Sequence, residues 1–289
     1  MATKPQSLTY ISKTGAKIDP RDKNNSWYDL TLKNLGSSGR ELLENYSKIP
    51  SAEVEDHVYK IRDEAWNIFP YPCIGEFRFL DLALSRSPDY PAVLQRLKSG
   101  NENFLDLGCC FGQELRKLAH DGAFQENLYG CDLRSEFFDM GYRLFLDRDI
   151  LKSKFIGADI FDFNSALSGL DGAIDIIYAG SFLHLFDYQT QVEVCKRIVK
   201  LLREKKDSLI LGRQVGNTVA GEFIQETNLG GIMYRHSGES FKKMWDEVGE
   251  ETGTKWRVEY DFVLLEGLRK EGDEVEPTLG MLRFSIFKN

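Results

Sequence analysis

The stretch Phe104-Leu105-Asp106-Leu107-Gly108-Cys109-Cys110-Phe111-Gly112 decides the fold, because a short apolar strand passes an acid and enters a turn with two glycines four residues apart. Glycine tolerates positive φ and lets backbone approach a bound molecule closely, so Gly108 and Gly112 permit a sharp strand-to-helix turn under a small charged ligand. The stretch Leu128-Tyr129-Gly130-Cys131-Asp132 repeats the arrangement and ends a second strand in an acid suited to ribose hydroxyls. Together the two stretches predict a nucleotide-like ligand at neighbouring strand ends.

The composition is that of one large globular unit. The chain has 289 residues, 42% of them hydrophobic and 28% charged, which is enough to bury one substantial core. A formal charge of -8 and a pI near 5.2 argue against binding to a phosphate backbone, which requires clustered Lys and Arg. The first residues are polar, and no segment approaches the ~20 apolar residues of a membrane span. We therefore expect a cytoplasmic protein without a nucleic-acid or membrane partner.

The cysteines also indicate an intracellular protein. They are odd in number, and most lie in apolar runs where a free thiol packs as a small hydrophobe. Cys109 and Cys110 are adjacent and have no neighbouring His, so no metal site is expected.

The chain is expected to consist of an N-terminal arm and helical cap over 1–100 and a ligand-binding domain over 101–289. In the second part strand and helix alternate, which predicts a parallel sheet covered on both faces. Strands are predicted at 103–107, 128–131, 154–157, 173–179 and 208–212, and helices at 113–120, 136–147 and 188–203. A helix at 237–249 and strands at 256–265 and 282–287 follow. The last two strands suit an antiparallel hairpin that closes one edge of the sheet.

The glycine turn does not fit a dinucleotide. Dinucleotide dehydrogenases use Gly-x-Gly-x-x-Gly, in which the second glycine makes room for a pyrophosphate. Here Cys110 takes the middle position and Gln113 the last. S-adenosylmethionine has no pyrophosphate, and its methionine part would lie along such a turn while its adenosine reaches the next strand end. We therefore expect this cofactor rather than a nicotinamide.

The segment 106–112 resembles the first motif of class I methyltransferases, with Cys110 in place of the central glycine. The resemblance implies a Rossmann-like α/β fold, with a mostly parallel seven-stranded sheet, helices on both faces, and S-adenosylmethionine as cofactor. In that family the acid at Asp106 lies near the cofactor's amino end, and the acid at Asp132 holds the ribose. The segment 157–161 resembles the one that meets the adenine, although Asp159 could equally cap a helix. The expected cofactor contacts are Asp106, Gly108, Cys110, Gly112, Asp132, Leu133, Asp159, Ile160, Ala179 and Gly180.

Other segments resemble fungal methyltransferases from meroterpenoid pathways, the AusD-like group. These segments are Ala65-Trp66, 69–75, 211–216 and 240–245. The resemblance covers most of the chain from about Ile61 to Val258. It implies methylation of the carboxylate of a hydrophobic, prenylated aromatic acid to a methyl ester, and a homodimer.

His184 follows the fourth predicted strand and therefore faces the expected reaction crevice. It could position a carboxylate, which is ionised at neutral pH and needs no base, or take a proton from a phenol or enol. An imidazole packed between aromatic residues is the structural alternative. Arg213 and Gln214, expected to leave the fifth strand on the same side of the sheet, could orient an anionic substrate, although Arg213 could equally form a structural ion pair. His236 is a weaker candidate for the same role.

The cap is expected to supply an apolar substrate wall from Trp66, Phe69 and Tyr71, with core packing as the alternative for each. Two other functions remain open at this point. One is a phenol or enol methyltransferase. The other is a protein that binds the cofactor without transferring its methyl group, as a scaffold or a catalyst of rearrangement.

Overall fold

Seven strands form the central sheet of the computed structural model, which describes residues 10–11, 17–33, 35–224, 231–265 and 277–289. In chain order the strands are β3 (Phe104–Leu107), β4 (Leu128–Asp132), β5 (Lys154–Gly157), β6 (Ile176–Gly180), β7 (Leu209–Asn217), β10 (Trp256–Leu264) and β11 (Leu279–Lys288). Across the sheet the order is β10-β11-β7-β6-β3-β4-β5. The strands β3 to β7 pair in parallel, and β11 runs antiparallel to both β7 and β10. The predicted parallel sheet and the antiparallel hairpin at its edge are confirmed.

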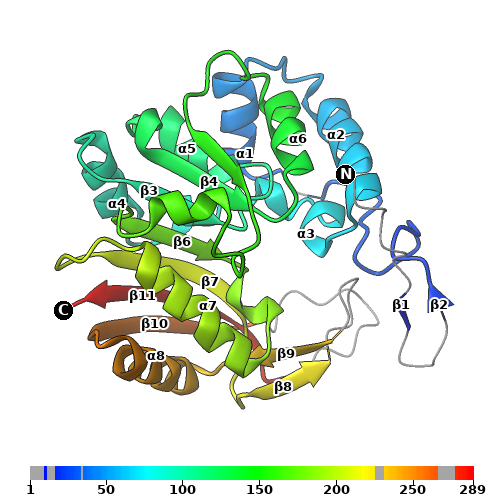
Figure 1. Ribbon diagram of the computed structural model, residues 1–289. Helices are drawn as coiled ribbons and strands as arrows, with labels where there is room; N and C mark the ends of the chain where they lie inside the picture. The colour runs from blue at the N-terminus through cyan, green and yellow to red at the C-terminus, as the bar shows by residue number, and fades with distance from the viewer. Residues whose placement is uncertain (1–9, 12–16, 34, 225–230, 266–276) are drawn as a thin grey trace.

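The strand order reverses between β3 and β6. From β3 the chain proceeds outward through β4 to β5, then crosses back to β6 and continues to β7 (Figure 1). In open parallel sheets, ligands bind at such a reversal, in the crevice outside the carboxyl ends of the strands. The strand β3 ends directly before Gly108, and β6 ends at Gly180. The topology therefore brings the two glycine-containing strand ends to one crevice.

Helices cover both faces of the sheet (Figure 1). Two of them, α4 (Tyr90–Lys98) and α5 (Gln113–His120), pack on one face, and α7 (Tyr188–Leu201) and α8 (Gly238–Thr252) pack on the other. Strand residues alternate between the two cores, since Phe104 belongs to the first and Leu105 to the second. The same period of two places Asp106 on the α4 and α5 face.

Local signals explain where several helices begin and end. The side chain of Asp187 accepts a hydrogen bond from the Thr190 amide (2.8 Å) and so caps α7. A capping box between Ser237 and Ser240 begins α8, and left-handed Gly253 ends it. The helices predicted at 113–120, 136–147 and 188–203 correspond to α5, α6 (Glu136–Phe145) and α7.

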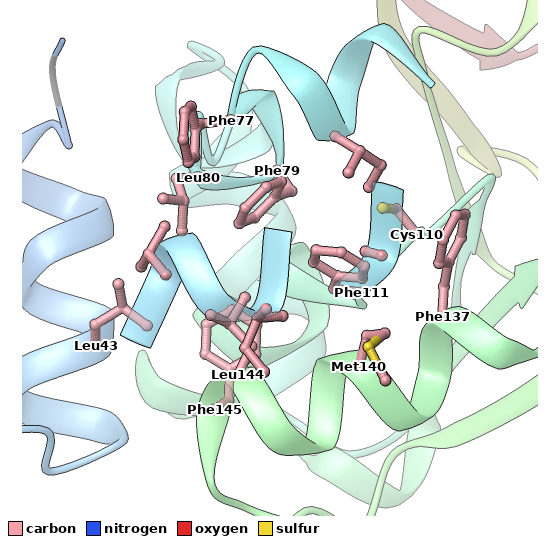
Figure 2. Close-up of a cluster of buried hydrophobic side chains, with 14 of the residues drawn as sticks. Leu43, Phe77, Phe79, Leu80, Cys110, Phe111, Phe137, Met140, Leu144 and Phe145 are labelled. Atoms are coloured by element: carbon pink, nitrogen blue, oxygen red, sulfur yellow. The ribbon is translucent and has the colours of Figure 1, made fainter. Parts of the chain in front are cut away.

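An N-terminal cap packs on α6 and on the glycine turn. Its elements are α1 (Ser37–Glu41), the π-helical η1 (Leu42–Tyr46), α2 (Val54–Ile68), α3 (Pro72–Gly75), and the 3-10 segments η2 (Arg78–Leu80) and η3 (Leu84–Arg86). Figure 2 shows Phe79 of the cap next to Phe111 of the turn, and Phe111 in turn lies next to Phe137 of α6. The cap, the glycine turn and α6 therefore share a hydrophobic core.

Several elements differ from the sequence prediction. The hairpin of β8 (Gly221–Ile224) and β9 (Ile232–Arg235) was not predicted. The predicted strand end at 212 was wrong, because β11 pairs with β7 as far as Asn217. In the expected arm, β1 (Tyr10–Ile11) pairs with β2 (Lys17–Ile18), while residues 1–9 and 12–16 lie outside the described residues. Short 3-10 segments complete the chain: η4 (Gln125–Asn127), η5 (Ala166–Leu170) and η6 (Leu183–Leu185).

The described residues include neither a membrane-spanning helix nor a metal-binding cluster. No helix among them is long and apolar enough to cross a bilayer. In the same part of the chain, no three His, Cys, Asp or Glu side chains gather in a way that could hold a metal ion. All five cysteines are free thiols.

Candidate active site

Three left-handed residues give the turn after β3 its shape. The φ angle is +72° at Gly108, +52° at Cys110 and +67° at Gly112. A residue with a Cβ atom costs about 1–2 kcal/mol in this conformation, so Cys110 occupies a strained position that favours glycine. The amides of Gly108 and Cys109 both donate to the carbonyl of Cys131 (2.8 and 3.1 Å), which ties the turn to β4. The turn therefore keeps the shape of a glycine-rich loop without its central glycine.

Asp132, the last residue of β4, contacts this turn directly. Its Oδ2 accepts a hydrogen bond from the Cys110 amide, and its Oδ1 accepts one from the Arg134 amide, both at 2.9 Å. Burial raises the pKa of Asp132, and these two amides oppose the rise. A carboxylate has about four acceptor positions, so Asp132 retains capacity for ligand hydroxyls. Leu133, the neighbouring expected contact, is 58% exposed.

Asp106 lies in β3 and is 2% exposed. Its Oδ2 has no hydrogen-bond partner within the described residues. Burial raises the pKa of Asp106 well above its usual range, and the charges of Glu114 and Asp132 raise it further. A buried oxygen without a partner is costly, and a cationic ligand group at the turn would satisfy it. The amino group of S-adenosylmethionine is such a cation, so Asp106 and Asp132 together fit this cofactor.

The segment after β5 packs beside Asp132. The Ala158 amide donates to the Asp132 carbonyl (3.1 Å). The Oδ1 atom of Asp159 accepts a hydrogen bond from the Phe161 amide (3.0 Å), so this oxygen stabilises a local turn. Ile160 is buried in the core that includes β3 residues, whereas Phe161 is 39% exposed. The exposed Phe161 ring, unlike buried Ile160, is therefore the apolar surface on which the adenine ring of a cofactor could pack.

The end of β6 lies across the crevice from the turn. A Cβ atom on Gly180 would lie 2.6–2.7 Å from the Tyr178 ring, and one on Gly108 would lie 2.9 Å from the Phe182 ring. Both positions therefore require glycine, because aromatic rings pack directly on the backbone. Ala179 is fully buried, so it presents no exposed surface of its own at this strand end.

His184 lies in η6, which follows β6 and packs against β7 and β9. Its Nδ1 atom is buried and has no hydrogen-bond partner in the described part of the chain. Burial, together with the positive charges of Arg78 and Arg235, lowers the pKa of His184 to about 4. The imidazole is therefore neutral at physiological pH. The two positive charges near it come from separate elements, Arg78 from η2 and Arg235 from β9.

Arg213 and Gln214 lie within β7 instead of beyond it. Arg213 pairs with Gly180 at the end of β6, and because successive side chains of a strand face opposite sides of the sheet, Gln214 faces the opposite side. Arg213 forms an ion pair with Asp81 (Nη2–Oδ2 2.9 Å). Gln214 is fully buried, and neither polar atom of its side chain has a partner among the described residues.

His236 follows β9 and is fully buried in an aromatic environment. Its ring lies 4.7 Å from the ring of Tyr234 and 5.5 Å from that of Phe241, measured between centroids. The Nδ1 atom is 2.9 Å from the Ser240 hydroxyl, and Nε2 has no partner within the described ranges. Burial lowers the pKa of His236 to about 3, so this ring is also neutral.

The three expected wall residues belong to the cap core. Trp66 is fully buried there, Phe69 is 3% exposed, and half-buried Tyr71 packs against them. The rings of Phe69 and Tyr71 lie 4.3 Å apart, and the Arg134 guanidinium lies 4.5 Å from the Phe69 ring centroid. Burial and the charge of Asp132 raise the pKa of Tyr71 to about 12. Phe69 and Tyr71 are therefore next to the expected ribose site.

Three charged residues near the site were missed by the sequence analysis. Arg78 comes from the cap, and Glu114 and Arg116 come from α5. The two α5 side chains are buried, and Glu114 Oε1 accepts a hydrogen bond from the Leu84 amide (3.1 Å). The signal that could have found them is a pair of charged residues directly after the glycine turn, in a helix expected to pack on a sheet. No local signal indicates Arg78.

Two family models match the chain. The meroterpenoid methyltransferase N-terminal domain matches residues 27–80, and the methyltransferase domain matches residues 104–205. The first match covers most of the cap, and the second covers the strands from β3 to β6 with their helices.

Curated relatives give the same assignment, and a solved structure shares the fold. The chain is 45% identical over 287 residues to the O-methyltransferase atr3 of Stereocaulon alpinum, with 94% of this chain and 83% of the relative covered. It is 45% identical over 233 residues to the asnovolin E/chermesin D methyltransferase nvfJ of Aspergillus novofumigatus, with 80% and 83% covered. A SAM-dependent methyltransferase of Leishmania major aligns with a TM-score of 0.50 at 13% identity, covering 100% of this chain and 99% of that one, and shares the fold.

Proposed function

Because this chain belongs to the fungal meroterpenoid methyltransferases, which use S-adenosylmethionine, we propose that it forms a methyl ester on a hydrophobic carboxylic acid. The methyltransferase activity and the cofactor follow from the family. The acceptor group is what is proposed, and the surroundings of His184 support it.

Neutral His184 beside two arginines is the observation that carries the proposal. A group whose conjugate acid has a pKa of about 4 is a poor proton acceptor for a phenol, whose own pKa is about 10. A carboxylic acid with a pKa of about 4 is already ionised at neutral pH and needs no base. The positive charges of Arg78, which also pairs with Glu76, and of Arg235 would favour such an anion near His184, and neutral His184 can donate one hydrogen bond to it. These surroundings suit a carboxylate better than a phenol or an enol.

The residues at the strand ends would hold the cofactor. Asp106 would pair with its amino group and Asp132 with its ribose hydroxyls, while Gly108 and Gly112 allow close backbone approach. When bound, S-adenosylmethionine supplies the methyl group. The chain itself has to hold the acceptor carboxylate in line and exclude water, and orientation of this kind can lower the barrier by about 7–11 kcal/mol.

The remaining candidate residues would contact the acceptor molecule. Gln214 and His236 present unpaired polar atoms from buried positions, and such atoms would suit polar groups of the substrate. Phe69 and Tyr71 would form part of the apolar wall near the cofactor, with Trp66 supporting them from the cap core. The homodimer and the cytoplasmic location implied by the resemblance stay predictions.

The test compares matched acids and phenols. We expect the purified chain to methylate an alkylated benzoic acid but not the phenol that lacks its carboxyl group. Mild alkali should hydrolyse the product, as it hydrolyses esters but not aryl methyl ethers. The kcat/KM for the acid should stay flat from about pH 6 to 9, because the pKa values of His184 and of the acid, each about 4, lie below this range.

A variant pair tests the arginine contribution in the same assay. Arg235→Gln should raise the KM for the acid about tenfold, because a charge-assisted contact is lost. Arg257→Gln, on the edge strand β10, serves as the control and should leave KM unchanged. An alkali-stable product, or a rate that rises about tenfold per pH unit toward the phenol pKa, would overturn the ester proposal.

A further inference from the structure

Arg116 of α5 is fully buried, and the proposed chemistry gives it no role. Its Nη1 atom donates to the carbonyl of Phe111 (2.6 Å) and, less closely, to that of Gly112 (3.3 Å). Both carbonyls belong to the glycine turn. The guanidinium therefore bonds to the inner side of the loop whose other residues contact Asp132.

Asp147 and Tyr46 hold the guanidinium in place. The Nε and Nη2 atoms of Arg116 donate to Asp147 Oδ2 (2.8 Å) and Oδ1 (2.9 Å), a two-point contact that fixes the plane of the guanidinium. The Tyr46 hydroxyl donates to Asp147 Oδ2 (2.8 Å). Tyr46 belongs to η1 of the cap, so a chain of hydrogen bonds leads from the cap through Asp147 and Arg116 to the turn.

The position of this cation is unfavourable for the helix alone. A positive charge in the first turn of a helix opposes the helix dipole, and a buried ion pair is no general source of stability. The turn, however, contains left-handed Gly108, Cys110 and Gly112, and its peptide planes need external partners to stay fixed. Arg116 supplies such partners to two consecutive carbonyls.

We infer that Arg116 is a positioning residue for the cofactor turn, and that Tyr46 of the cap acts on the turn through Asp147. The inference rests on the proposed cofactor role of the turn. Cofactor affinity should therefore depend on the shape of the guanidinium and not only on its charge, since an ammonium group cannot bond to Asp147 and to the two carbonyls in the same plane.

Arg197 of α7 provides a matched control. It is 2% exposed and pairs with an aspartate, with its Nη1 atom 2.5 Å from Asp171 Oδ1. Its other described contacts are the Ser168 hydroxyl and the ring of Phe163. Replacing Arg197 by Lys thus disturbs a similar buried pair on the other face of the sheet.

The experiment measures binding of S-adenosylmethionine and S-adenosylhomocysteine to the full chain by calorimetry, together with thermal unfolding of the ligand-free protein. Arg116→Lys should weaken binding of both molecules about tenfold or more, and Tyr46→Phe about twofold to fivefold. Arg197→Lys should change either affinity less than twofold, although both arginine variants lower the unfolding temperature. At saturating cofactor, kcat of Tyr46→Phe should stay within about threefold of the original, because its defect lies in the KM for the cofactor.

Equal cofactor affinities in the Arg116→Lys and Arg197→Lys variants would overturn the inference. If Arg116→Lys does not fold, Tyr46→Phe decides, because it removes a single hydroxyl, and an unchanged affinity would then count against the connection to the cap. Failure of the unmodified chain to bind either molecule would overturn the cofactor site itself, and so is distinguishable from failure of this inference.

Discussion

Glu114 is a buried acid next to the cofactor turn, and only one of its oxygens has a partner within the described residues. Oε1 accepts a hydrogen bond from the Leu84 amide, whereas Oε2 has none. Burial raises the pKa of Glu114 to about 7, although the amide and the charge of Arg213 act in the opposite direction. The side chain therefore changes its charge within the physiological pH range.

We predict that Glu114→Gln gains stability relative to the original chain as the pH rises. The pKa of Glu114 is higher in the folded state than in the unfolded state, so its stabilising contribution is complete below about pH 4.5 and is lost as the pH rises through about 7. Glutamine keeps the acceptor for Leu84 and does not ionise. The difference in unfolding free energy between the two proteins should shift by about 3 kcal/mol between pH 4.5 and pH 8, measured by urea unfolding.

Glu102 supplies a control of opposite sign. Against the effect of burial, hydrogen bonds from Arg96 and Lys205 lower its pKa. Its contribution is therefore present above about pH 4.5 and is lost as the pH falls, so Glu102→Gln should be most destabilising at neutral pH. A Glu114→Gln protein whose stability follows the original chain in parallel from pH 4.5 to pH 8 would contradict the prediction.

Helix α6 packs against the cofactor turn at Gly141, so closely that only glycine fits at this position. A Cβ atom at Gly141 would lie 2.2 Å from the Phe111 carbonyl oxygen and 3.2 Å from Arg116 Nη1. This carbonyl is the one that receives the shorter Arg116 hydrogen bond. Gly141 therefore lets the helix pack on the turn while the guanidinium bonds to the same oxygen.

Gly141→Ala should destabilise the protein despite a better helix propensity. Alanine is favoured over glycine by about 1 kcal/mol inside a helix, but the overlap with backbone forces a shift that typically costs about 1–3 kcal/mol and here also distorts the hydrogen bond of Arg116. We expect a net loss of roughly 1–2 kcal/mol in urea unfolding. Gly169→Ala in η5, whose Cβ atom would meet nothing within 4 Å, should change stability by less than about 0.5 kcal/mol. Equal stabilities of the two variants would refute the argument.

The parallel strands could be predicted because their signals are contiguous. The strand β3 is an unbroken buried run, and its acid and glycines follow at fixed spacing, so both the strand and the cofactor turn are encoded within ten residues. The hairpin of β8 and β9 was missed because its strands are only four residues long, with half-buried and exposed positions alternating in β8 and a single buried residue, Met233, in β9. The end of β7 was placed too early because its last residues are specified by pairing with β11, far along the chain.

The acceptor side and the support of the turn could be predicted only in part. His184 could be selected as a candidate because it follows a strand end at the reversal of strand order, and its role stays a prediction. Packing of the cap brings Arg78 near His184 and Tyr46 into contact with Asp147. Nothing in the sequence around either residue indicates these contacts. The same packing explains why Phe69 and Tyr71 lie near Asp132, a position that their sequence context does not specify.

The cap and the cofactor turn form one packed unit, which predicts that damage to the cap core reaches the cofactor. The ring of Phe79 lies 4.8 Å from that of Phe111, and Phe111 lies 5.7 Å from Phe137 of α6 (Figure 2). Phe79→Leu should cost about 1–2 kcal/mol of stability and raise the cofactor dissociation constant severalfold, because Phe111 would lose the ring that fixes its position. Phe241→Leu, an equally buried change within α8, should cost similar stability without altering cofactor affinity. Calorimetric titration of both variants with S-adenosylhomocysteine, at a temperature where both remain folded, decides the matter, and equal affinities would mean that the cap contributes stability alone.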